Sequence, residues 1–271
     1  MGLASLVHRD LDSEFAGSIG SSVRVRVPGA VPAQTRPVNS LATLTKDAIT
    51  EQSIAVSLDV EAYSLVPLSD GDLDLDIKDY GVQVLLPQTR ALTRYVERSL
   101  VAAMQATPAS TITYAAATPA KAFTAIRKAL RDAGVPADVK IHAAVGSSVY
   151  GALLDAPTGT FDADGKSVRG IEVHESTRLA ATEIVAFVRD AFAVVVRAPR
   201  VPDGAPYGAS VKDKEAGFAL RLIRAYDPNI AADTSLLTAF VGVQAMPLAV
   251  DNEDGTVDLV EHGGVIRVVT A

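Results

Sequence analysis

Residues 51–106 decide the fold of this chain. Their second half, residues 87–106, reads PQTRALTRYVERSLVAAMQA, and their first half has two runs of alternating apolar residues around turn residues at 67–71. Alternation with a period of two indicates strands. We therefore predict that residues 54–60 and 73–77 pair in a two-stranded ribbon, about 30 Å long at ~3.3 Å per residue. The first strand carries Ile54, Val56, Leu58 and Val60, and the second alternates Leu73, Leu75 and Ile77 with Asp72, Asp74 and Asp76.

Such a ribbon needs support from outside itself. An isolated two-stranded ribbon is marginal in water, and each exposed aliphatic side chain forgoes roughly 1.5–3 kcal/mol of burial. We do not expect a compact monomer of this length to supply a supporting surface, or platform, for the ribbon. We therefore treat two surfaces of the ribbon as candidate subunit contacts: its apolar face (Ile54, Val56, Leu58) and the acid ladder (Asp72, Asp74, Asp76).

The segment 87–106 is predicted to be a helix with two different faces. Pro87 suits a helix start, and an apolar stripe that includes Leu92, Val96 and Leu100 recurs at helical spacing. A second stripe, the arginine stripe, consists of Arg90, Arg94 and Arg98. Like charges four residues apart repel one another. The stripe is either a solvated face or a contact for carboxylates of a neighbouring chain, with the acid ladder as one candidate.

Residues 1–50 are predicted to be an extended arm. Val23, Val25 and Val27 alternate with Arg24 and Arg26, as in a half-buried strand with a basic outer face. Several prolines follow between 28 and 37, which excludes a helix there. The arm has too little apolar material for a core of its own, so we expect it to lie on another surface, with Arg24 and Arg26 as candidate contacts.

Residues 107–250 are predicted to form a compact α/β region. Thr118 and Pro119 indicate the start of a helix, and Gly134 follows its end. Strands are expected at 139–145, 168–174, 183–188 and 217–226, with a short helix capped by Ser147 between the first two. Residues 257–269 are expected to form a terminal hairpin or a paired strand.

Composition excludes several functional classes. The chain has 271 residues, 48% of them hydrophobic, so we expect it to fold. Its formal net charge of −7 makes it a poor candidate for binding nucleic-acid phosphates. It has no cysteine, which excludes disulfides, thiol catalysis and cysteine-based metal sites. We find no export signal and no membrane span, and we expect a soluble protein made in the cytoplasm.

No motif predicts catalysis, a cofactor or a metal. The four histidines show no ligand spacing, and Asp162-Ala-Asp164-Gly165 and Asp70–Asp74 lack the closing residues of a calcium loop, so both are interpreted as turns. A serine hydrolase would have to use Ser148 with His174 or His262, but the spacing around Ser148 does not match a nucleophile elbow. We therefore predict no catalytic, cofactor-binding or metal-binding residue and expect no enzymatic activity.

The order of these parts resembles the major capsid protein of tailed bacteriophages, the Hong Kong 97 fold. The branch that it resembles most is that of the coat proteins of short-tailed enterobacterial phages. The resemblance spans nearly the whole chain in family order. It is carried by residues 6–11 (LVHRDL), 20–28 (GSSVRVRVP), 54–59 (IAVSLD), 75–80 (LDIKDY), the helix 86–104, and residues 129–136 (ALRDAGVP), 170–176 (GIEVHES), 226–228 (YDP) and 240–243 (FVGV).

The resemblance implies an α+β fold with four parts. Residues 1–50 would be the N-terminal arm, and residues 51–79 the extended loop, which in such capsids lies on the adjacent subunit. Residues 80–109 and 246–271 would form the peripheral domain, with a spine helix and a returning last strand. Residues 110–245 would be mainly the α/β axial domain, with part of the peripheral sheet.

The resemblance also implies function and partners. The chain would self-assemble through pentamers and hexamers into the icosahedral shell of a virion, formed in the host cytoplasm, that encloses double-stranded DNA without sequence-specific binding. A separate scaffolding protein and a portal are expected, and a decoration protein is possible. The ribbon tip at 63–70 lacks lysine, which argues against lysine–asparagine cross-linking. The alternatives are an encapsulin, a cargo compartment of the same fold, and, from another class, a small α/β serine hydrolase.

Overall fold

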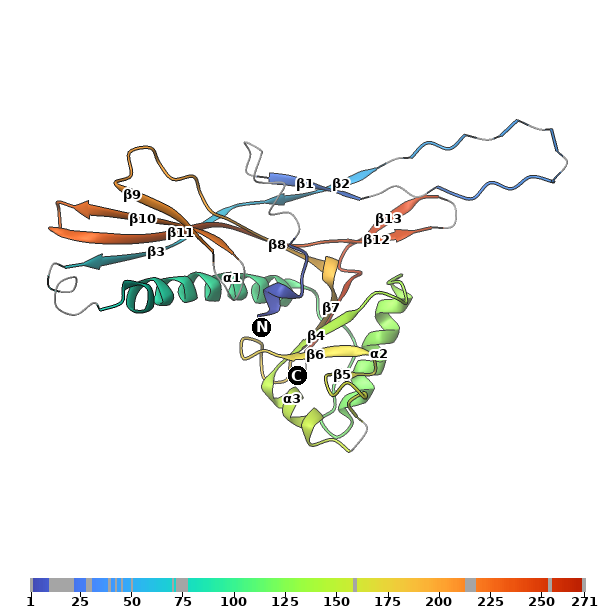
Figure 1. Cartoon of the computed structure of the whole chain (residues 1–271). Coiled ribbons are helices and arrows are strands. Elements are labelled where there is room, and N and C mark those ends of the chain that lie inside the picture. The colour runs from blue at the N-terminus through green and yellow to red at the C-terminus, as the bar shows by residue number, and fades with distance from the viewer. Residues whose placement is uncertain are drawn as a thin grey trace.

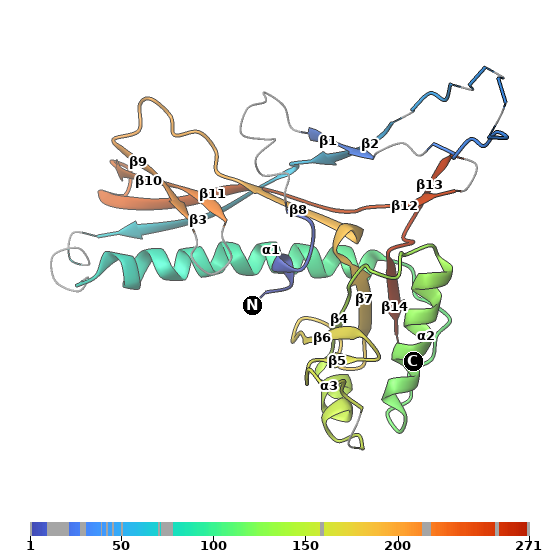
Figure 2. The same cartoon turned by 45° about the vertical axis from the view of Figure 1, so that its right-hand side comes forward.

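The computed structural model of the chain describes residues 2–9, 22–27, 31–38, 40–41, 43–44, 46–49, 51–69, 71, 78–157, 160–212, 218–252 and 255–269. Two bodies meet at an angle (Figure 1): a long helix lies beneath a sheet, and a smaller α/β body extends from one end of that helix. A two-stranded ribbon with a long loop projects away from both, which the turned view also shows (Figure 2). The architecture confirms the predicted α+β class.

The long helix α1 (Leu86–Ala106) confirms the predicted spine helix. A π-helical turn, Gly81–Leu85, precedes it, and its 21 residues span about 32 Å. The predicted apolar stripe is buried, with Leu92, Val96 and Leu100 at most 3% exposed, and it packs against β3 and β11. Among the described residues, no helix combines the length and the apolar character needed to cross a membrane.

The sheet above α1 is antiparallel and is built around one long strand. Its order is β3 (Val60–Leu68), β11 (Ala232–Ala245), β10 (Ala219–Asp227) and β9 (Tyr207–Lys212), and β8 (Phe192–Arg197) also pairs with β11. Gln88 fastens the start of α1 to this sheet. Its buried amide donates hydrogen bonds to the carbonyl oxygens of Ser64 (3.0 Å) and Ser235 (2.9 Å) and accepts one from the Ser235 hydroxyl.

The second body packs two helices against a mixed sheet. The helices are α2 (Pro119–Asp132) and α3 (Ser147–Leu154), and the sheet order is β14 (Val265–Val268), β7 (Ile184–Val188), β4 (Ile141–Val145), β6 (Ile171–Glu175) and β5 (Ser167–Val168). The bounds of α2 confirm its predicted start, and Gly134 follows its end at φ +98°, a conformation that glycine adopts without strain. One detail differs, since the residue that caps α3 is Gly146, and Ser147 is the first helical residue.

The ribbon is present, but its predicted pairing is wrong. Strand β2 (Gln52–Ser57) pairs with β1 (Ser22–Val27), and residues 60–68 join the sheet above α1 as β3. Pro67, expected in a turn, lies inside β3, which is the terminal strand of its sheet and can therefore accept a proline. Alternation fixes which side chains share a face and does not name the partner strand. The expected second strand, residues 72–77 with the acid ladder, lies outside the described residues.

The C-terminal segment confirms the hairpin or paired strand predicted for residues 257–269, but not the expected return to the sheet on the spine helix. Strand β13 (Val257–Val260) pairs with β12 (Leu248–Asp251), whereas β14 pairs with β7 in the α/β body. The expected return of the C-terminal strand to the sheet on the spine helix is therefore wrong. A tight turn redirects the chain between β13 and β14, with His262 at φ +57° and a hydrogen bond from the Val265 N–H to the His262 carbonyl oxygen.

A buried ion pair joins the two bodies. Glu183, which precedes β7 and is 2% exposed, accepts a hydrogen bond from Arg267 Nε of β14 at 2.7 Å and one from Gln105 near the end of α1 at 3.0 Å. Arg267 also donates to the Thr107 carbonyl oxygen just past α1. Burial alone would raise the pKa of Glu183, but the hydrogen bonds from Gln105, Arg267 and the Ala180 N–H, together with the Arg267 charge, outweigh burial and lower the pKa. The pair therefore holds a charged carboxylate at the corner of the molecule.

Candidate subunit interfaces

The loop between β1 and β2 presents apolar side chains to solvent. Val38 and Leu41 are fully exposed, and Leu44 and Ile49 are about two-thirds exposed. A single exposed aliphatic residue is ordinary, but a series of them on one projecting segment marks a contact surface. The loop projects from the body (Figure 2), and its exposed side chains give it the kind of apolar surface that was expected on the ribbon strands.

The base of this loop is fastened to the β12–β13 hairpin. The Gln52 side chain donates a hydrogen bond of 2.8 Å to the Val257 carbonyl oxygen. Gly255, in the turn between β12 and β13, has φ +83°, and a Cβ at this position would collide with Pro32. Glycine at 255 therefore permits the loop to pass close to the hairpin, beyond which the loop projects from the body.

The apolar face of β2 is turned inward, which corrects the expected role of Val56, while the half-buried Ile54 and Leu58 stay candidate contacts. Val56 has no exposed surface and packs with Ala193, Val195 and Met246, while Ile54 and Leu58 pack against the same cluster. Gly242 in β11 makes the close crossing possible, because a Cβ there would collide with the Ser57 carbonyl oxygen. The platform that the ribbon needs is thus supplied, on this face, by the chain's own β8 and the end of β11. Val56 cannot contact a neighbour in this conformation.

The candidate charged contacts are placed in part. Arg24 is exposed on β1, and Arg26 lies on the same strand, but its side chain is outside the description. Arg90, Arg94 and Arg98 are all exposed on α1. None of these three pairs with a carboxylate within the described part of the chain. Among the described residues, the arginine stripe is therefore an exposed cationic surface without a carboxylate partner. Its pairing with the acid ladder stays a prediction.

Glu97 has a structural role that no sequence pattern indicates. It is 5% exposed on α1, and its carboxylate accepts hydrogen bonds from the backbone N–H groups of Leu3 (3.1 Å) and Ala4 (3.2 Å). These two residues begin the 3₁₀ turn Leu3–Ser5 (η1), so Glu97 satisfies N–H groups that the turn itself cannot. A Cβ at Gly2 would collide with this carboxylate. The N-terminal segment 2–9 is therefore fastened to the spine helix.

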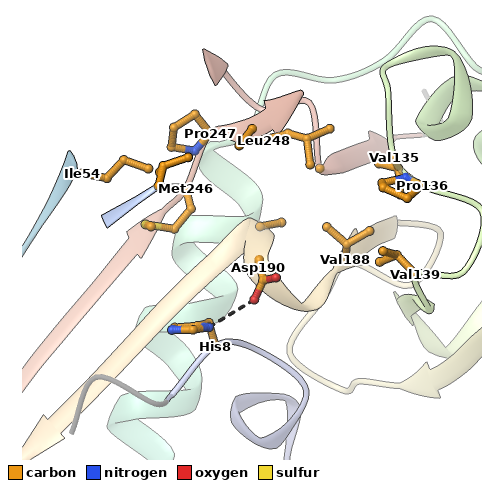
Figure 3. A pocket seen from close by; sticks show the side chains of 14 residues that line it. His8, Ile54, Val135, Pro136, Val139, Val188, Asp190, Met246, Pro247 and Leu248 are labelled. Carbon is orange, nitrogen blue, oxygen red and sulfur yellow. Dashed lines mark hydrogen bonds and ion pairs between the residues drawn. The ribbon is translucent and has the colours of Figure 1, made fainter. Parts of the chain in front are cut away.

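An apolar cavity of about 390 Å³ lies at the base of the ribbon (Figure 3). Ile54, Val135, Val188 and Met246 are among its lining residues, and its one side-chain ion pair is formed by His8 and Asp190 at 3.1 Å. None of its described lining residues is a serine, threonine or cysteine. Ser148, the nucleophile of the hydrolase alternative, forms no hydrogen bond with His174 or His262 within the described chain. Within the described residues, Ser148 is therefore not paired with either histidine that the hydrolase alternative would need as its base.

The α/β body contains two further polar groups of note. Asp164 closes the turn predicted at 162–165, where a hydrogen bond from the Ser167 hydroxyl and two from backbone N–H groups lower its pKa to about 2. His142, Glu172 and His174 form a cluster on β4 and β6. No spacing in the sequence indicates this cluster, because its members become neighbours only through the parallel pairing of the two strands.

The comparisons with known proteins place the fold. No family model matches the sequence, and no curated protein matches it either. Among solved structures, the chain is similar to one from Mycobacterium phage Che8 (TM-score 0.63, 16% identity, 98% of this chain and 89% of that one). It is also similar to the capsid of cyanophage A-1(L) (TM-score 0.61, 12% identity, 92% and 87%) and to a virus-like particle from Pyrococcus furiosus (TM-score 0.55, 10% identity, 99% and 92%).

These similarities confirm the fold predicted from the sequence. They extend over nearly the whole of both chains in each comparison, so they concern the complete arrangement of spine helix, sheet, α/β body and ribbon. The chain has the Hong Kong 97 fold of phage capsid proteins. At identities of 10–16%, the likeness is one of fold.

Proposed function

We propose that this chain is the major capsid protein of a tailed bacteriophage. It self-assembles through pentamers and hexamers into the icosahedral shell that encloses the phage genome. The observation that carries the proposal is the full-length likeness to phage capsid structures, joined to a projecting apolar loop that the subunit cannot bury by itself.

The surface area of the subunit supports assembly. Its accessible surface is 15604 Å², whereas a compact monomer of this mass exposes about 11,200 Å². The excess of about 4,400 Å² lies within the range that permanent assemblies bury, roughly 2,000–5,000 Å². An extended subunit of this kind gains stability by covering its surface with copies of itself.

The parts of the subunit take the following roles in this proposal. The β1–β2 ribbon and its loop are the extended loop that lies on the adjacent subunit, so the loop begins earlier than the 51–79 expected from the sequence. The layer of α1 and its sheet is the peripheral domain, and the body of α2, α3 and β14-β7-β4-β6-β5 is the axial domain at the centre of each capsomer. Arg24, Arg26, the arginine stripe and the acid ladder are contact candidates between subunits.

The wider assembly follows from the same proposal. The shell forms in the host cytoplasm with a separate scaffolding protein and a portal, a decoration protein is a possible addition, and the mature protein resides in the virion. DNA is enclosed without sequence-specific binding, in keeping with a net charge of −7. The role is structural, with no enzymatic activity.

One alternative has a specific observation in its favour. The similarity to the virus-like particle from Pyrococcus furiosus gives weaker support, on grounds of fold, to a closed protein compartment such as an encapsulin. The contents of purified particles separate the two functions. Nuclease-protected DNA, together with a co-purifying scaffolding protein, supports the capsid, whereas an enclosed protein cargo supports the compartment.

The proposed role of the loop is tested by sedimentation velocity on the chain expressed with its neighbouring genes. Leu41→Asp places a charge on a fully exposed loop residue, so it should leave the subunit folded and shift it from particles to small species. Leu41→Met, which keeps the apolar surface, is the matched control and should assemble normally. Normal particle yield from Leu41→Asp would contradict the assigned contact.

A further inference from the structure

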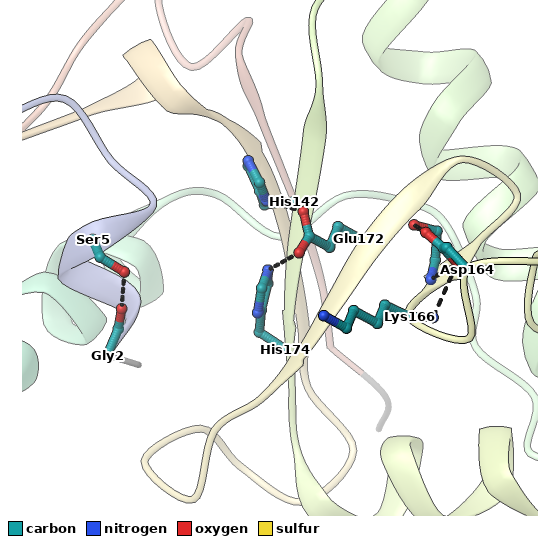
Figure 4. A network of polar contacts seen from close by, with 8 residues as sticks. Gly2, Ser5, His142, Asp164, Lys166, Glu172 and His174 are labelled. Atoms are coloured by element: carbon teal, nitrogen blue, oxygen red, sulfur yellow. Dashed lines mark hydrogen bonds and ion pairs between the residues drawn. The ribbon is translucent and has the colours of Figure 1, made fainter.

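Three potential metal ligands meet on one face of the sheet in the α/β body. Strands β4 and β6 run parallel, with His142 opposite Glu172 and Ala144 opposite His174. Side chains alternate between the faces of a strand, so His142, Glu172 and His174 all point to the same side. Figure 4 shows the Glu172 carboxylate between the two imidazoles.

The distances within this cluster are close to those of a coordination sphere. His142 Nδ1 lies 3.5 Å from one Glu172 oxygen, and His174 Nε2 lies 3.7 Å from the other. One ligand atom from each of the three residues lies within 4.8 Å of the others. Zinc ligands at about 2.0–2.1 Å from the ion are about 3.3 Å apart in a tetrahedral site. Each imidazole lies near that distance from one of the two Glu172 oxygens, so an ion held by both carboxylate oxygens would need only small side-chain movements.

The ring nitrogens that face Glu172 are buried without a hydrogen-bond partner. His142 Nδ1 and His174 Nε2 each have almost no exposed surface and no hydrogen bond within the described chain. Leaving a buried polar atom unsatisfied costs free energy, and such an atom in a native protein calls for an explanation. A bound cation would satisfy both nitrogens and both carboxylate oxygens together.

The surroundings leave the imidazoles able to act as ligands and leave a way in for an ion. Burial lowers the pKa of both histidines more than the Glu172 charge raises it. The His174 and Glu172 side chains remain 27% and 36% exposed, so an ion and a water ligand can enter. Nearby cations oppose binding, among them Lys140 and Lys166, whose charges also lower the pKa of His142 and His174, respectively.

We propose that His142, Glu172 and His174 form a binding site for a divalent transition-metal ion of the zinc class, with water as the remaining ligand. Two imidazoles and one carboxylate are a ligand set that zinc binds with an open position. Nitrogen ligands favour such ions over Mg²⁺ and Ca²⁺, which prefer sites made of oxygen ligands. The ion would link β4 to β6 and stabilise the α/β body, because any ligand that binds the folded state alone stabilises it.

The test is a calorimetric titration of Zn²⁺ into the full-length chain, produced without a histidine tag and freed of metal with a chelator. We expect one Zn²⁺ per chain, a rise in melting temperature on binding, and no comparable effect of Mg²⁺. Co²⁺ bound in the same place should give the strong visible absorption of a tetrahedral site.

Three variants decide whether these residues are the ligands. His174→Gln should weaken Zn²⁺ binding by well over 10-fold, because losing a mere outer-shell partner already costs roughly 10–100-fold. His262→Asn is the matched control, since its side chain is 31% exposed and also has a buried unpartnered nitrogen, and Asn tolerates its positive φ. It should bind Zn²⁺ like the unmodified chain. Lys166→Gln removes an opposing charge and should tighten binding.

Three results would overturn the proposed metal site. The site is refuted if the unmodified chain binds no Zn²⁺ at a one-to-one ratio. It is also refuted if His174→Gln, shown by circular dichroism to be folded, binds as tightly as the unmodified chain, or if His262→Asn loses as much affinity as His174→Gln.

Discussion

The ion pair at the corner of the molecule allows a quantitative prediction. Replacing Arg267 with Met keeps most of the side-chain volume but leaves the Glu183 carboxylate, 2% exposed, without its cationic partner. Breaking a buried pair by removing one member costs roughly 3–5 kcal/mol. The Arg267 side chain is 22% exposed, so we expect the lower end, about 3 kcal/mol. At about 2–4 °C per kcal/mol, the melting temperature should fall by roughly 6–12 °C.

The assay is urea denaturation of the unassembled subunit, with thermal melting as a second measure. The double variant Glu183→Gln with Arg267→Met removes the stranded charge and keeps an acceptor for Gln105, so it should recover much of the loss. Lys128→Met breaks an exposed pair with Asp132 and should cost no more than about 0.5 kcal/mol. A loss below about 1 kcal/mol for Arg267→Met, or a double variant no more stable than Arg267→Met alone, would refute the reasoning.

The same pair predicts a dependence on pH. The pKa of Glu183 in the folded chain lies below its ordinary value of 4.5, so its contribution is present above that pH and is lost as the pH falls through the lowered value. In Arg267→Met, burial and the Gln105 hydrogen bond remain, but the hydrogen bond and the positive charge of Arg267 are lost, so the carboxyl group takes up a proton more readily. The stability difference between the two proteins should therefore shrink as the pH falls below about 4.5. A difference that is constant between pH 7 and pH 4 would contradict this account.

Three further predictions concern single contacts. Gly242→Val should displace the ribbon base and abolish particle assembly, as seen by electron microscopy. Gly151→Ala, whose new Cβ meets open space, should assemble normally. Equal particle yields from the two variants would refute the argument that β2 crosses β11 closely at Gly242. Glu97→Ala removes two hydrogen bonds to a charged group, roughly 1.5–3 kcal/mol each, and should expose the N-terminal segment to limited proteolysis; an unchanged digestion pattern would argue against the anchor. Ser167→Ala should raise the pKa of Asp164 from about 2 towards 3.8 in an NMR titration, and an unchanged value would rule out the hydroxyl as the main cause.

Local signals in the sequence are sufficient to predict the helices 86–106 and 119–132. The periodicity of residues 87–106 and the bracketing of α2 by Thr118, Pro119 and Gly134 depend on neighbours within a few turns, and both predictions are confirmed. Strand partners depend on contacts between distant segments, which alternation does not encode. That is why the ribbon was assigned the wrong second strand. The long central strand β11 was not predicted as an element either, because its burial does not follow a simple alternation.

The candidate contact residues show the same difference between local signals and contacts of distant segments. The arginine stripe is exposed as a helical face should be, because helix geometry alone decides which residues share it. The apolar face of β2 was expected at a subunit contact, but it packs on Ala193 and Val195, whose distance in sequence hid the partnership. The cluster of His142, Glu172 and His174 depends on a parallel register across 30 residues, which no spacing rule reveals.

The central claim is that the chain builds closed shells, and electron microscopy of the chain expressed alone and with its neighbouring genes tests it most directly. The account predicts closed particles or open tubes of regular lattice, with fivefold and sixfold clusters of subunits in class averages. A folded protein that stays monomeric under both conditions would contradict it, because the apolar loop and about 4,400 Å² of excess surface would then remain exposed to water.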